Sequence, residues 1–109
     1  MSLALRHEKQ EQITVSTSKQ TITSALFDSA SAGVPLNIIS ANIQHIAGGD
    51  VYHTTNTTTP SNSGANGEYK MVLGDIWEVK SLRDIKNWSA IIASGESDAT
   101  LQVELVGAP

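Results

Sequence analysis

The residues best suited to chemistry in this sequence are its histidines, because imidazole is both a common metal ligand and a proton carrier near neutral pH. His45 and His53 flank a Gly-Gly turn, and together with Asp50 they could hold a transition metal between neighbouring strands. No histidine has a companion two or four positions away, as a local metal motif would require. The alternative is that both are half-exposed strand residues without a ligand. We prefer that alternative and expect neither a metal nor a cofactor.

No pattern in the sequence matches an active site. Serine and threonine are abundant, but none lies in a G-x-S-x-G elbow or beside a recognisable base. The paired acids Asp75 with Glu78 and Glu96 with Asp98 lie beside predicted turns, where solvated carboxylates are ordinary. The glycines are dispersed at turns and form no phosphate-binding loop, and the chain has no cysteine for thiolate chemistry. We therefore predict a protein that is not an enzyme and has no catalytic residues.

Two tryptophans, Trp77 and Trp88, offer a different chemistry. Exposed indoles on a β-sandwich can stack on sugar rings, so a carbohydrate-binding module is the alternative from another functional class. The chain has only two Trp, two Tyr and one Phe, however, and its core also needs large side chains. We expect both tryptophans to pack in the core or in an interface.

Composition excludes several classes of partner. A chain of 109 residues is long enough for one domain with a single core. Seven Lys and Arg residues against eleven Asp and Glu give a net charge of −4, which provides no cationic surface for nucleic acid. No run of eighteen apolar residues and no apolar leader is present, so we expect no membrane partner and synthesis in a cytoplasm.

The elements that must position any site are strands, because apolar residues alternate with polar ones along most of the chain. Eight strands are predicted, over residues 12–16, 20–27, 36–46, 51–54, 68–73, 76–82, 88–94 and 99–105. Turn signals at 47–50 and 74–75 predict two hairpins, and 83–88 predicts one turn or a 3₁₀ segment. The fold is expected to be an all-β antiparallel sandwich, jelly-roll-like or Ig-like, with residues 13–109 as one domain.

The same alternation predicts which side chains face the core. The expected inward set is Ile13, Val15, Ile22, Ile39, Ile43, Leu73, Trp77, Val79, Ile92, Leu101 and Val103. In the 36–46 run Ile38 has the opposite parity to Ile39 and Ile43, which a β-bulge would explain.

Two segments fall outside the strand pattern. Residues 1–12 are rich in charge and are predicted to form an extended N-terminal arm, either frayed or lying on a neighbouring subunit or on the domain's own flank. The uncharged loop 54–67 is long for a compact domain without a binding or assembly role, and we expect it to project from the domain. The candidate interface residues are Leu3, Leu5 and Arg6 in the arm, and Thr57, Thr58, Thr59, Pro60 and Asn62 in the loop.

Four segments between residues 50 and 106 carry a family resemblance: DVYHT, PSNSG, GEYKMVLGDIWEV and LRDIKNWSAIIASGESDATLQVEL. Their order resembles that in the small β-sandwich structural proteins of tailed-bacteriophage virions. The resemblance implies a head decoration or cement protein, or a head–tail, tail or fibre component. It also implies a homo-oligomer that is made in the host bacterial cytoplasm and binds the major capsid protein or another virion protein.

Overall fold

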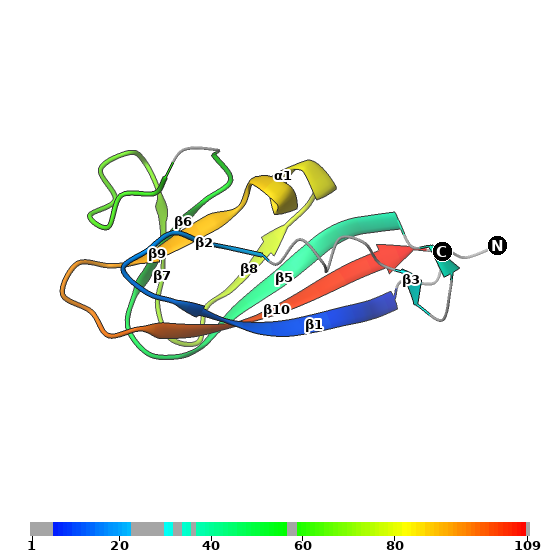
Figure 1. The fold of residues 1–109 in the computed structure, drawn as a ribbon, viewed down its shortest axis with the longest axis horizontal. Helices are drawn as coiled ribbons and strands as arrows, with labels where there is room; N and C mark the ends of the chain where they lie inside the picture. Colours follow the sequence, from blue (N-terminus) through cyan, green and yellow to red (C-terminus); the bar gives the residue numbers. More distant parts are fainter. Residues whose placement is uncertain (1–5, 23–29, 32–33, 36, 57–58, 109) are drawn as a thin grey trace.

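The fold is a sandwich of two four-stranded antiparallel sheets with one short helix (Figure 1). The computed structural model describes residues 6–22, 30–31, 34–35, 37–56 and 59–108. The long sheet contains, in order, β1 (Arg6–Val15), β10 (Ala99–Ala108), β5 (Asn37–Ala47) and β8 (Ile76–Val79). The short sheet contains β2 (Gln20–Thr21), β9 (Ser89–Ile92), β6 (Val51–Thr54) and β7 (Tyr69–Met71). A small pair, β3 (Ala30–Ser31) with β4 (Val34–Pro35), completes the strands, and the predicted all-β sandwich is confirmed.

Consecutive strands of the two large sheets cross from one sheet to the other, except β6 and β7, which pair within the short sheet, and this is the strand order of a jelly roll. The connections β1–β2, β5–β6, β7–β8 and β9–β10 each cross from one sheet to the other. Both hairpins predicted at 47–50 and 74–75 are therefore wrong. The two edges of β5 are occupied by β10 and β8, so β6 cannot pair with β5 and joins the short sheet instead.

The core lies between the sheets and follows the period-2 pattern of the sequence. Of the predicted inward set, these side chains are buried: Ile13, Val15, Ile22, Ile43, Val79, Ile92, Leu101 and Val103. Trp77 is partly buried and packs against the core. The prediction is wrong for two members of the set. Ile39 is 39% exposed, and Leu73, in the turn after β7, is 62% exposed.

The predicted irregularity in β5 is present twice. Between Ser40 and Ile38 the register with β10 skips Ile39, and between Ala47 and His45 it skips Ile46. Each skipped residue is the extra residue of a bulge, which releases its side chain from the inward row. Ile39 and Ile46 are therefore both exposed, whereas Ile38 is buried.

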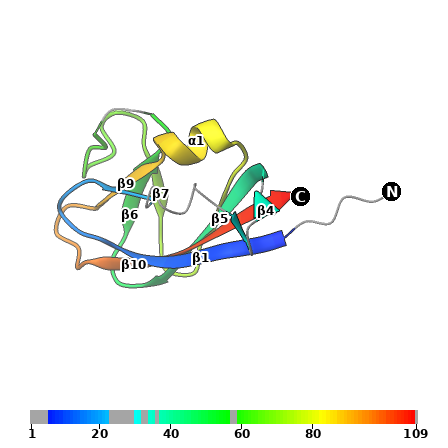
Figure 2. The ribbon, with the colours of Figure 1, turned by 45° about the vertical axis from the view of Figure 1, so that its right-hand side comes forward.

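The predicted arm over residues 1–12 is wrong from Arg6 onward. β1 begins at Arg6, opposite Gly107, and pairs with β10 as far as Val15, opposite Ala99. Its charged residues hide the alternation, but an edge strand tolerates and often uses charges. Residues 1–5 lie outside the described residues. Figures 1 and 2 show β1, β5 and β10 running past the short sheet to the end where β3 and β4 lie.

At the opposite end of the sandwich two crossing turns approach closely. Gly48 has φ +90°, and a Cβ built on it would lie 2.0 Å from the carbonyl oxygen of Asp98. The Gly49 N–H donates to the Ser97 carbonyl at 3.3 Å. The glycine pair is therefore required by the contact between the β5–β6 and β9–β10 turns, and not by a hairpin.

The segment predicted as one turn or a 3₁₀ segment is a six-residue α-helix, α1 (Leu82–Asn87). The Ser81 side chain caps it by accepting from the Asp84 N–H at 3.1 Å. Ile85 is fully buried, so the helix is held by one apolar anchor in the core. The helix leads from the edge strand β8 into β9, across the end of β5 (Figure 1).

Candidate functional site: an aromatic cleft at the sandwich edge

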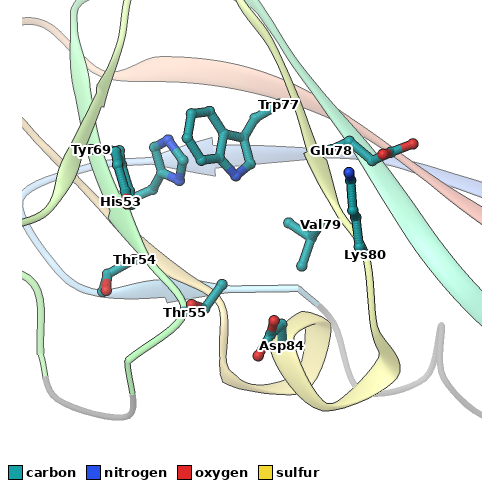
Figure 3. Close-up of a pocket in the computed structure, with 9 residues that line it drawn as sticks. All are labelled: His53, Thr54, Thr55, Tyr69, Trp77, Glu78, Val79, Lys80 and Asp84. Atoms are coloured by element: carbon teal, nitrogen blue, oxygen red, sulfur yellow. The ribbon is translucent and has the colours of Figure 1, made fainter.

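A cleft of about 290 Å³ opens between the two sheets where β7 and β8 form the edge of the sandwich (Figure 3). Residues from β6, β7, β8 and α1 line it: His53, Thr54, Thr55, Tyr69, Trp77, Glu78, Val79, Lys80 and Asp84. The volume is close to the lower limit for small-molecule sites, so it suits a single small ring. We call it the edge cleft.

Aromatic rings form one wall of the edge cleft. Tyr69 packs on Trp77 with ring centroids 4.9 Å apart and an interplanar angle of 36°. His53 meets Trp77 edge to face, with centroids 4.7 Å apart. The contacts join the short sheet, which carries Tyr69 and His53, to the long sheet, which carries Trp77. Tyr69 remains 58% exposed, so an aromatic surface is accessible from solvent.

His53 has a defined protonation state. It is 1% exposed, and burial lowers its pKa from 6.5 to about 4, so the imidazole is neutral at pH 7. The indole N–H of Trp88 donates to His53 Nδ1 at 3.3 Å. An indole nitrogen can only donate, so Nδ1 must be the acceptor and the proton must lie on Nε2. Nε2 has no hydrogen-bond partner among the residues that the structure describes.

The remaining wall of the edge cleft is polar. Glu78, Lys80 and Asp84 line the cleft together with the hydroxyl-bearing Thr54 and Thr55, and Figure 3 shows the Glu78 carboxylate directed away from the aromatic rings. The wall thus combines hydrogen-bond donors with acceptors and carries little net charge. Such a site can bind a neutral, hydroxyl-rich molecule, and its chemistry is that of recognition.

The two tryptophans predicted as possible stacking residues differ in their exposure to the cleft. Trp88 is fully buried beneath His53, so it cannot stack on a ligand, and its predicted packing in the core is confirmed. Trp77 lines the edge cleft and is only partly buried. The aromatic partner of Trp77 is Tyr69, which the sequence analysis did not single out.

The prediction that both histidines are half exposed is wrong, because each is only 1% exposed. They lie in different sheets, since His45 is in β5 and His53 in β6. His45 Nε2 donates to the Gly49 carbonyl. In the described part of the chain no group of three or more histidines and carboxylates is placed to hold a metal ion, so the His45, His53 and Asp50 set does not form.

Of the predicted arm residues, Leu3 and Leu5 lie outside the described residues, and Arg6 is the first residue of β1.

The predicted loop is only partly described, since Thr57 and Thr58 lie outside the described residues. From Thr59 onward it folds back on itself, because Glu68 accepts from the backbone N–H groups of Ser61 and Asn66. Thr59 and Asn62 are exposed, and Pro60 is buried. The Asn62 carbonyl accepts from the Ser94 N–H at 2.9 Å. This part of the loop is therefore a closed structure tied to the end of β9 and not a free arm.

An exposed apolar patch lies beyond the edge cleft on the β7–β8 turn. Its members are Ile46, Val72, Leu73 and Ile76, which are 38%, 41%, 62% and 66% exposed. The turn is tied to β5 because the Gly74 N–H donates to the His45 carbonyl and the His45 N–H donates to the Asp75 carbonyl. Ile46 follows His45 directly, so we group all four side chains as the turn patch.

The sequence analysis missed Tyr69 as a site residue and considered His53 only as a metal ligand. They are opposite each other in the β6–β7 pairing, but this register follows only after the predicted hairpins are abandoned. The sequence carries no signal that separates Tyr69 from Met71 and Leu73, which share its parity, although in the structure Met71 is buried whereas Tyr69 and Leu73 are exposed.

Among the described residues no helix is long and apolar enough to cross a membrane. The chain matches no protein-family model, no curated protein and no solved structure.

Proposed function

We propose that this protein is a non-enzymatic structural protein of a tailed-bacteriophage virion, a capsid decoration or cement protein that binds copies of itself and the major capsid protein. The observation that carries the proposal is the turn patch. Four large apolar side chains on one end of a small domain exceed the scattered exposure that is normal for a monomer. An interface that covers them would be stabilised by about 1.5–3 kcal/mol for each side chain that becomes fully buried.

Two further observations support an assembly role. The segments of the virion resemblance form β6 to β10 and include most of the turn patch. The jelly roll is also an architecture of viral capsid domains, although a fold alone does not define a function. Repetition of one apolar contact by symmetry gives a firm assembly without charge or disulfides.

The experiment compares two isoleucines in the same strand. Ile46→Asp places a charge in the turn patch, and Ile39→Asp is the matched control because Ile39 is equally exposed and is also a bulge residue. We expect sedimentation velocity to show an oligomer for the unchanged protein and for Ile39→Asp, and a monomer for Ile46→Asp. Co-sedimentation with phage particles should follow the same order.

A protein that stays monomeric at high concentration and has no affinity for phage particles would contradict the proposal. A tail or fibre component is the alternative within the same class. Immunogold labelling of virions separates the two, because a decoration protein labels the whole head whereas a tail component labels one end.

A further inference from the structure

We propose that the edge cleft is a binding site for a neutral sugar, whose ring packs on Trp77 and Tyr69 and whose hydroxyl oxygen accepts a hydrogen bond from His53 Nε2. The inference goes beyond the assembly role, because the edge cleft and the turn patch share no residue.

The first argument is the unpaired donor. His53 is buried, and its Nδ1 is occupied by the Trp88 indole, so Nε2 carries a proton that has no acceptor among the described residues. A buried donor without an acceptor is destabilising by about 1–3 kcal/mol, and such groups often mark a place for a ligand or water. His53 lines the edge cleft, but its Nε2 has almost no accessible surface, so an oxygen atom bound in the cleft accepts from it only after a small rotation of the neighbouring rings.

The second argument is the aromatic wall. Trp77 and Tyr69 come from different sheets and are tilted by 36°, which gives the cleft an apolar surface beside its polar wall. The C–H face of a pyranose ring is apolar, whereas its edge carries hydroxyls. One sugar ring can therefore cover the aromatic rings and still direct its hydroxyls to Asp84 and to the hydroxyls of Thr54 and Thr55.

The hydrogen-bond chemistry separates a sugar from a cationic ligand. Each hydroxyl both accepts and donates, so it can accept from His53 Nε2 and donate to a carboxylate at the same time. A quaternary ammonium ion also favours aromatic rings and carboxylates, but it has no acceptor for His53. Lys80 in the lining further disfavours a cation.

The test measures binding of glucose, galactose, mannose and N-acetylglucosamine, with tetramethylammonium as the cationic probe. We expect at least one sugar to bind with a Kd of about 1 mM or tighter in calorimetry or saturation-transfer NMR. The ¹⁵N resonance of His53 Nε2 should shift on binding. A glycan array then shows whether the preferred ligand is a free monosaccharide or the end of a longer glycan.

Three variants examine the site itself. Tyr69→Ala should weaken sugar binding about tenfold, because it removes an exposed ring and its loss of packing is small. Trp77→Phe should weaken it less, since a smaller ring remains. Ile39→Ala is the control, because Ile39 is exposed on β5 and belongs neither to the cleft lining nor to the turn patch.

Three outcomes would overturn the proposal. One is the absence of binding by every neutral sugar at about 10 mM, ten times a 1 mM Kd. Another is equal binding by the Tyr69→Ala and Ile39→Ala variants. The third is binding of tetramethylammonium alone. An intact oligomer that fails to bind sugar would reject this inference and leave the assembly proposal standing.

Discussion

At the residue scale, His53 is a buried polar side chain whose tautomer, ring position and protonation state are determined by its neighbours. The Trp88 indole occupies Nδ1, the Trp77 ring packs against the imidazole, and burial keeps the group neutral. The pair of hydrogen-bonded side chains links the core of the sandwich to the edge cleft. Substitutions at Trp88 should therefore affect the cleft through His53 and not by direct contact with a ligand.

The lowered pKa of His53 makes stability depend on pH. Desolvation lowers the pKa to about 4 from 6.5, so the unfolded chain binds a proton that the folded chain does not. The contribution of His53 to the free energy of unfolding is fully present above pH 6.5. It is lost as the pH decreases towards 4, by about 3 kcal/mol in total. Urea unfolding at about pH 7 and about pH 5 measures the loss. In His53→Gln most of this dependence should vanish, and an unchanged dependence would contradict the assignment.

Glu68 predicts a second pH effect, which is confined to the 59–68 loop. Backbone N–H donors, first that of Ser61, lower the pKa of Glu68 below its usual value of 4.5. The loop is therefore held closed above the ordinary carboxyl range and opens as the pH falls through the lowered pKa. Amide hydrogen exchange at Ser61 and Asn66 should accelerate in Glu68→Gln. Equal exchange in both proteins would show that the carboxylate does not close the loop.

At the scale of elements, the crossing turns at one end of the sandwich fasten connections that lie far apart in the sequence. The β5–β6 turn contacts the β9–β10 turn, and Ala93 and Ile92 in that region donate to the carbonyls of Asp50 and Ser16. These hydrogen bonds join connections that are far apart in the sequence. They explain why glycine occurs where two backbones meet.

Gly48 and Gly95 form a matched pair for this argument. Both have positive φ, but a Cβ on Gly48 would collide with the Asp98 backbone, whereas a Cβ on Gly95 would meet nothing within 4 Å. Gly95→Ala should cost only the strain of positive φ, about 1–2 kcal/mol. Gly48→Ala should cost about 3 kcal/mol or more, since the two turns must also separate. Chemical denaturation measures both, and equal costs would reject the close contact as the cause.

The N-terminal strand supplies an element-scale prediction that replaces the expectation of a removable arm. Deleting residues 2–5 should leave the sandwich folded, because β1 begins at Arg6. Deleting residues 2–11 removes six residues of β1, and with them the hydrogen bond from Gln10 to Glu104. The free edge of β10 should then lower the thermal midpoint and favour aggregation. Identical melting of the two truncations would show that residues 6–11 contribute nothing to the sheet.

At the scale of the whole molecule, the surface has little long-range electrostatic attraction and one apolar end. A net charge of −4 on 109 residues is small, and the turn patch contains no charged member. An assembly that uses this end should therefore depend on apolar burial. Its contacts would be repeated by symmetry and not strengthened by ion pairs.

Salt distinguishes this form of assembly from an electrostatic one. Apolar contacts are not screened, whereas exposed ion pairs lose most of their strength as the Debye length falls from about 10 Å at 0.1 M to about 3 Å at 1 M. We expect the oligomer and its binding to phage particles to persist in about 1 M NaCl. Ile46→Asp should abolish both at low salt. Dissociation of the unchanged protein by salt alone would contradict a patch-based interface.

The sequence by itself determined the local features of this protein. The alternation of Ala99, Leu101, Val103 and Leu105 identified a strand and its buried face, because period 2 is a property of each strand alone. The odd parity of Ile38 indicated a bulge, and turn residues located the chain reversals. The sequence also named one residue of the edge cleft, Trp77, because an indole can be recognised as a stacking side chain without knowledge of the strand pairing.

Only the tertiary structure decided how these strands pair. β10, the last strand, inserts between β1 and β5, and this long-range competition for hydrogen-bonding edges converts two expected hairpins into crossings between sheets. Charges hid β1 because an edge strand does not need a continuous apolar face. The edge cleft is a product of the crossings, since they bring His53 and Tyr69 in one sheet against Trp77 in the other. Contacts of that kind depend on pairing between distant segments, which a local residue pattern does not record.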